Sequence, residues 1–122
     1  MYYSIGQFAD ISQMNIDTLR YYEKEQLIVV SRDASGRRRY TEEDFQWILF
    51  IKRLKETGMP IKDIRRYALL RFQGDSTIEE RLQMLEQHRL FVLAEKEKWE
   101  SNLIHLEEKI KIYENKMMGM QK

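Results

Sequence analysis

Residues 4–22, with the sequence SIGQFADISQMNIDTLRYY, decide the fold because they predict two short helices with a tight turn between them. Ser4 and Gln7 have the spacing of a capping box, which predicts that the first helix begins at about Ser4. Asn15 can cap a second helix, and Asp17 lies in its first turn, where the helix dipole favours an anion. Two helices joined in this way are a candidate helix-turn-helix.

The segment after the second helix predicts a β-hairpin with a basic return strand. A β-branched run at residues 27–30 precedes a turn sequence at residues 33–36, whose glycine gives the permissive backbone that such a turn needs. Residues 37–40, RRRY, then form the return strand. Four arginines and one aspartate lie between Arg32 and Tyr40, whereas the net charge of the 122-residue chain is only +1. The positive charge is therefore concentrated on the predicted hairpin, which fits either a solvated loop or a nucleic-acid partner.

Two more helices complete a predicted head domain of residues 1–74. Thr41 can cap a third helix that ends at Gly58, and Pro60 starts a fourth helix that closes at residues 73–75. Their buried faces are predicted at Phe45, Ile48, Leu49 and Leu54 and at Ile61, Ile64, Ala68 and Phe72. The expected fold class is mainly α: four helices and a small hairpin in the head, then a long helix.

Residues 75–118 predict one long dimerisation helix, opened by a capping box of Ser76 and Glu79 and followed by a tail at residues 119–122. Alternating steps of three and four residues from Ile78 are apolar at ten of twelve positions, which is typical of a coiled coil. The apolar positions, expected at the dimer seam, are Ile78, Leu82, Leu85, Val92, Trp99, Leu103, Leu106, Ile110, Tyr113 and Met117.

The seam is longer than the head can cover, because a helix of about 40 residues spans roughly 60 Å. An identical chain is the simplest partner, although these residues do not fix the strand direction. Arg89 and Lys96 interrupt the seam and either specify register or bind an anionic ligand.

Several classes of protein are disfavoured by what the sequence lacks. It has no cysteine, so disulfides and thiolate metal sites are excluded, and no apolar stretch is long enough for a membrane span. The first residues do not resemble a secretory signal, and no nucleophile-base arrangement or phosphate-binding glycine loop is evident. We expect a cytoplasmic protein that is not an enzyme and uses no metal or cofactor.

Four segments together resemble the MerR family of bacterial transcription regulators, in family-like order and spacing over residues 2–73. They are YSIGQFA at 3–9, TLRYYE at 18–23, GRRRYT at 36–41 and IKRLKETG at 51–58. The resemblance implies a winged helix-turn-helix head whose second helix enters the major groove and whose hairpin is the wing. It also implies a homodimer joined by an antiparallel coiled coil.

The resemblance further implies DNA contacts from Arg20, Tyr21, Arg38, Tyr40 and Lys55, with Tyr22 packed beneath the first two. Arg and Lys neutralise phosphate charge, and a tyrosine hydroxyl can donate to a phosphate oxygen. Asp17 either reads a base amino group or only serves the helix terminus. The residues expected at the DNA are Ser4, Asn15, Asp17, Thr18, Arg20, Tyr21, Arg37, Arg38, Arg39, Tyr40 and Lys55.

Members of that family typically activate transcription by bending and untwisting a promoter, so RNA polymerase would be affected indirectly. We expect this mechanism here, with a hinge at residues 72–77 and an unknown effector, for which a small molecule is one candidate. An architectural or excisionase-like DNA-binding protein, or a coiled-coil adaptor, is the alternative. His88 and His105 are expected at the surface. The aromatic residues Trp47, Tyr67, Phe91 and Trp99 either line a pocket or belong to the core and the seam.

Overall fold

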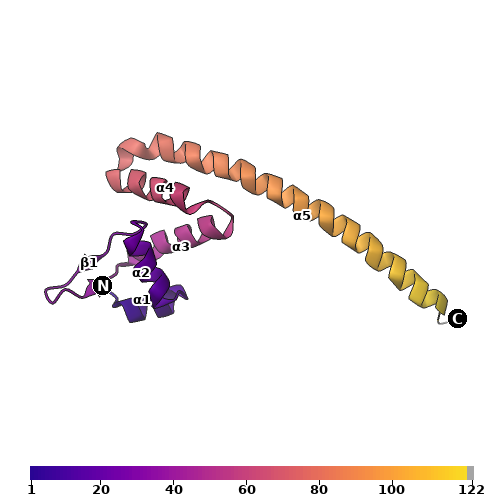
Figure 1. Ribbon diagram of the computed structural model, residues 1–122, viewed down its shortest axis with the longest axis horizontal. Coiled ribbons are helices and arrows are strands. Elements are labelled where there is room, and N and C mark those ends of the chain that lie inside the picture. Colours follow the sequence, from indigo (N-terminus) through magenta and orange to yellow (C-terminus); the bar gives the residue numbers. More distant parts are fainter. Residues whose placement is uncertain (121–122) are drawn as a thin grey trace. The chain divides into compact units, whose positions relative to one another are not determined.

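The computed structural model describes residues 1–120 and consists mainly of helices, with one small hairpin (Figure 1). Its elements are α1 (Ile5–Ser12), α2 (Ile16–Lys24), β1 (Ser31–Arg32), β2 (Arg38–Arg39), α3 (Glu42–Glu56), α4 (Ile61–Gln73), the 3-10 helix η1 (Asp75–Thr77) and α5 (Ile78–Met120). The chain divides into two units, at residues 1–84 and from residue 85 onward. The predicted fold class, a winged head followed by a long helix, is confirmed.

Local capping produces the helix-turn-helix as predicted. The Ser4 hydroxyl accepts from the Gln7 amide, and the Gln7 side chain accepts from the Ser4 amide at 2.9 Å, which completes the capping box. Gln13 has a left-handed backbone, with φ of 55°, and so ends α1. Asn15 then caps α2 by accepting from the Asp17 amide at 2.7 Å.

The hairpin is shorter than predicted. β1 pairs antiparallel with β2, with Ser31 opposite Arg39 and Arg32 opposite Arg38, and Gly36 turns the chain with φ of 85°. The strand predicted at residues 27–30 is wrong. Leu27 is buried in the core, and its carbonyl accepts a hydrogen bond from the indole of Trp47 at 2.9 Å instead of joining a strand ladder.

α3 and α4 close the core of the head. Thr41 caps α3 in a reciprocal capping box with Asp44. Ile48, Leu54, Ile64 and Ala68 are buried as predicted. Trp47 and Tyr67 belong to the core, which is one of the two alternatives given for them, and the sequence prediction missed buried Ile51 and Leu70. The predicted burial of Phe72 is wrong, because this side chain is 69% exposed. Successive steps of four residues drift about 40° around a helix, which turns Phe72 away from the face that Ile64 occupies. Phe45, Leu49 and Ile61 are only partly buried.

The passage from α4 into α5 differs from the prediction. α5 begins at Ile78 after the 3-10 turn η1, so Ser76 is not its N-cap. The residue that organises the junction is Thr77, whose buried hydroxyl donates to the carbonyls of Leu70, at 2.5 Å, and Gly74, at 2.8 Å. Gly74 has φ of 100°, a conformation that glycine adopts without steric cost. The expected hinge at residues 72–77 therefore includes a glycine turn held by the Thr77 hydroxyl and by the guanidinium of Arg81, which donates to the Gly74 carbonyl at 3.1 Å.

α5 extends past Gly119 to Met120, and residues 121 and 122 of the predicted tail lie outside the described residues. None of its residues is buried. In the described part of the chain, no helix is both long enough and apolar enough to cross a membrane.

Candidate DNA interface

The second half of α2 presents two of the predicted contact residues to solvent. Leu19 and Tyr22 are buried in the core, so the side chains between them, those of Arg20 and Tyr21, point outward. The Arg20 side chain is 56% exposed, and Tyr21 is 44% exposed. A terminal nitrogen of Arg20 lies 3.7 Å from Asp17 Oδ1. The prediction that Tyr22 packs beneath this surface is confirmed, and its burial raises the pKa of its phenol.

Lys55 reaches the same surface from α3. Its ammonium lies 5.5 Å from the centre of the Tyr22 ring, within the range of a cation-π contact, and its side chain is exposed. The structure thus brings Lys55 next to α2, although Lys55 and Tyr22 are more than 30 positions apart in the sequence.

The three consecutive arginines of the wing have different surroundings. Arg37 is exposed near the turn, whereas Arg38 and Arg39 are partly buried. The Arg39 guanidinium lies 4.2 Å from the centre of the Tyr2 ring, and its Nε is buried without a hydrogen-bond partner. Of the three, Arg37 is the most accessible cation and Arg39 is the one held by an aromatic ring.

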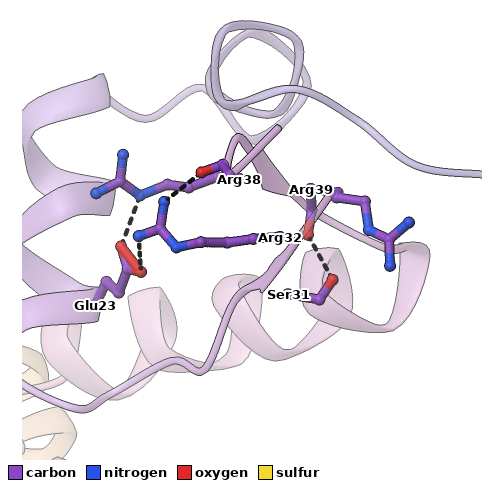
Figure 2. Close-up of polar contacts among 6 residues, drawn as sticks. Glu23, Ser31, Arg32, Arg38 and Arg39 are labelled. Carbon is purple, nitrogen blue, oxygen red and sulfur yellow. Dashed lines mark hydrogen bonds and ion pairs between the residues drawn. The ribbon is translucent and has the colours of Figure 1, made fainter. Parts of the chain in front are cut away.

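Arg38 and its cross-strand neighbour Arg32 share one carboxylate (Figure 2). Arg38 donates from Nε to Glu23 Oε2 at 2.7 Å, and a terminal nitrogen of Arg32 donates to Glu23 Oε1 at 3.1 Å. The hydrogen bond to Glu23 raises the pKa of the Arg38 guanidinium above its ordinary value. Glu23 lies in the last turn of α2, so this carboxylate links the second helix to both strands of the wing.

The turn of the wing is organised by Asp33. Its carboxylate accepts hydrogen bonds from the Ser35 amide at 2.9 Å, the Ser35 hydroxyl at 2.7 Å and the Arg37 amide at 3.0 Å. These bonds, that of the Ser35 hydroxyl first, lower the pKa of the Asp33 carboxyl. These hydrogen bonds therefore hold the turn and the backbone of Arg37 in one conformation.

Tyr40 corrects one sequence-based expectation. It was expected at the DNA, but it is fully buried, and its ring stacks on Phe8 with centroids 4.3 Å apart. Its backbone exchanges two hydrogen bonds with Tyr3, each 2.8 Å long, which tie the wing to the N-terminal segment. Burial raises the pKa of Tyr40 to about 12. Because its ring belongs to the core, Tyr40 holds the base of the wing.

The remaining predicted contact residues lie at the helix N-termini. Ser4 and Asn15 use their side chains as caps, and Asp17 is exposed in the first turn of α2. Thr18 is half-buried one residue later. Their contacts with DNA stay predictions.

The ten predicted seam residues of α5 are all at least partly accessible. Exposed fractions reach 72% at Trp99, and Leu103, Leu106 and Ile110 are each about half exposed. Arg89, which interrupts the seam, is exposed, and Lys96 forms an ion pair with Glu100 at 3.7 Å.

The four aromatic residues considered from the sequence fall into two groups, one in the head and one on α5. Trp47 and Tyr67 are both buried and stack on each other, with ring centroids 5.8 Å apart. Phe91 and Trp99 are exposed on α5, and His88 is half-buried and stacks on Phe91. Within residues 1–120, no group of three or more histidine, cysteine or acidic side chains is arranged to hold a metal ion.

Sequence reasoning missed the role of Glu23 and Arg32. Both were visible as charged residues, but their contact joins positions nine apart across a helix end and a loop. A carboxylate at the end of a predicted DNA-reading helix, followed by an excess of arginines, is the signal that could have indicated an internal ion pair.

Comparison with known proteins assigns the chain to a family. The model of the MerR HTH family regulatory proteins matches residues 3–69, and a second model, described as MerR, DNA binding, matches residues 45–108. An uncharacterized HTH-type transcriptional regulator of Haemophilus influenzae is 39% identical, over all of this chain and 92% of the relative. The regulator AdhR of Bacillus subtilis is 41% identical, over 70% of this chain and 62% of its own length.

Solved structures agree with this assignment. HiNmlR, described as a MerR family regulator lacking the sensor domain and bound to promoter DNA, is 39% identical and matches with a TM-score of 0.87 over 94% of this chain and 92% of its own. A MerR family transcriptional regulator from Listeria monocytogenes, 30% identical, matches with a TM-score of 0.91 over 98% of this chain and 91% of that chain. This chain therefore belongs to the MerR family of helix-turn-helix transcriptional regulators.

Proposed function

We propose that this regulator acts in the cytoplasm as a homodimer that places two winged heads on a near-palindromic promoter operator and bends and untwists the DNA between them. The observation that carries the proposal is the pairing of two features. The head exposes Arg20, Tyr21, Arg37 and Lys55 around α2 and the wing, and α5 exposes a long apolar seam that only Arg89 and Lys96 interrupt. The basic surface of the head fits a phosphate backbone, and the apolar seam of α5 fits a protein partner.

The seam argues for a second copy of the chain. Fully burying one large apolar side chain is worth about 1.5–3 kcal/mol, and the heptad positions repeat from Ile78 to Met117. A coiled coil of two such helices would cover them, and an antiparallel arrangement would hold the two heads apart. HiNmlR, whose likeness extends over nearly the whole chain, is bound to promoter DNA, which supports the same target here.

The charged contacts give the expected salt dependence of DNA binding. If Arg20, Arg37, Arg38 and Lys55 each neutralise one phosphate, a dimer neutralises about eight, and log affinity should fall against log salt with a slope of about −7. A slope near zero would contradict this contact set.

Bending gives a route to control of RNA polymerase without direct contact. Deforming a site of this size costs of order 1–6 kcal/mol, so an effector need only change the spacing of the heads by a comparable free energy. The junction at residues 72–77 is the proposed hinge, because Gly74 allows rotation and Thr77 fixes one state. A small molecule is one candidate for that effector.

The test has two stages. Selection from a random duplex library, followed by footprinting on the DNA beside its own gene, should yield a two-fold symmetric site. Gel mobility of circularly permuted fragments should then show a bend centred on that site. Straight DNA in the complex would contradict the mechanism, and a bend with no change in transcription from the promoter would favour an architectural role.

A further inference from the structure

We infer that Glu23 is a positioning residue for DNA binding: its carboxylate fixes the wing against α2 and aims Arg38 at the DNA backbone. The inference rests on the proposed function for its DNA step, but its geometric part concerns the free protein. It begins from the register of the hairpin. Arg32 and Arg38 are cross-strand partners, and the two oxygens of Glu23 take one arginine each (Figure 2).

The wing needs such a fastening because it is small. Its strands contain two residues each, and an isolated two-stranded hairpin is marginally stable at best. The backbone bridge between Tyr3 and Tyr40 holds the return strand at the base of the wing. Glu23 adds a link from both strands to α2, the helix that the family places in the major groove.

The geometry leaves Arg38 able to hold a second anion. Glu23 engages it through Nε, so the two terminal amino groups of the guanidinium are not used by that ion pair. A guanidinium has five N–H donors in a fixed fork, and pinning one edge orients the others. The side chains of Glu23 and Arg38 are only 22% and 26% exposed, which limits the directions in which Arg38 can point.

Charge alone makes the opposite prediction, and this separates positioning from simple electrostatics. A carboxylate at the end of α2 reduces the positive potential that attracts phosphate, so removing its charge should strengthen binding to any duplex. If Glu23 acts by geometry, removing it weakens binding to the selected duplex, because the arginines lose their orientation.

The experiment uses the full-length protein, the duplex selected by the wild type and a shuffled duplex of the same composition. We expect Glu23→Gln to weaken binding to the selected duplex by about fivefold and binding to the shuffled one by no more than that, because a phosphate contact does not depend on the base sequence. Glu23→Asp keeps the charge but withdraws the carboxylate, and we expect the same loss. Asp10→Asn removes one exposed carboxylate of α1 and is the matched charge control, expected to change both affinities by the same small factor.

A second readout needs no DNA. Backbone amides of residues 31–39 should exchange with solvent several-fold faster in both Glu23 variants, with the melting temperature nearly that of the wild type, because local opening is detected separately from global unfolding. Wild-type affinity in Glu23→Asp, tighter binding of Glu23→Gln to both duplexes, or unchanged amide exchange would overturn the inference. If the wild type binds no duplex, the proposed function fails, and the amide exchange still decides whether Glu23 fastens the wing.

Discussion

Replacing Leu103 by Lys should break the proposed dimer without unfolding the chain. Leu103 lies in the middle of the α5 seam and is 52% exposed. Leucine and lysine have similar helix propensities, so the helix itself should persist. About half of the value of burying a leucine, near 1 kcal/mol, remains to be gained on association, and a symmetric dimer contains two copies. Adding the cost of desolvating an ammonium gives a total loss of about 2–4 kcal/mol.

That loss corresponds to a dimer dissociation constant raised roughly 30-fold to 1,000-fold, measurable by sedimentation equilibrium. The matched control is Ser101→Lys, which adds the same charge to an exposed position on the opposite side of the helix and should leave the dimer intact. Operator binding at nanomolar protein should be lost only in the Leu103 variant. If both variants associate like the wild type, the heptad stripe is not the dimer interface.

Other substitutions test the head. Arg37→Ala should weaken binding to the selected duplex by about fivefold and make the slope of log affinity against log salt shallower by nearly two, because a dimer loses two phosphate contacts. A full wild-type slope would remove Arg37 from the contact set. Arg39→Ala should instead lower the melting temperature, because the guanidinium of Arg39 packs over the Tyr2 ring. An unchanged melting temperature in calorimetry would show that this packing does not stabilise the head. Tyr40→Phe removes a buried hydroxyl that lacks a hydrogen-bond partner, so denaturant titration should show stability unchanged or higher by about 1 kcal/mol. A loss of stability of more than about 1 kcal/mol would show that the hydroxyl has a hydrogen-bond partner. The pKa of Tyr40 is raised to about 12 from an ordinary value near 10, so the folded state favours the neutral phenol. The contribution of this neutral phenol to the free energy of unfolding is complete below pH 10 and is lost as the pH rises towards 12. Absorbance titration of the phenolate, compared between wild type and Tyr40→Phe, would detect the raised pKa.

The features predicted correctly from sequence are those set by neighbouring residues. Ser4, Asn15 and Thr41 cap helices through bonds that span two or three positions, and Gly36 adopts a positive φ in its turn. The long helix that begins at Ile78 also follows from the period of its own residues. Such interactions can be recognised without knowing how the chain folds back on itself.

Three of the errors and omissions arise where distant parts of the chain meet. Tyr40 looked like an exposed member of a basic strand, but Phe8, more than 30 positions earlier, supplies a ring on which it stacks. The run that begins at Leu27 had strand composition, yet its first carbonyl pairs with Trp47. Glu23 was assigned no role because its partners come from a separate hairpin. Each outcome depends on tertiary packing, which overrides local propensity.

The central claim is that two copies of this chain act together on one duplex, and the stoichiometry of the complex tests it most directly. Native mass spectrometry of the protein on its selected duplex should find two chains of 14.9 kDa per DNA, and no appreciable complex with one chain, at concentrations where the site is half occupied. A single chain bound to the duplex with undiminished affinity would contradict the account.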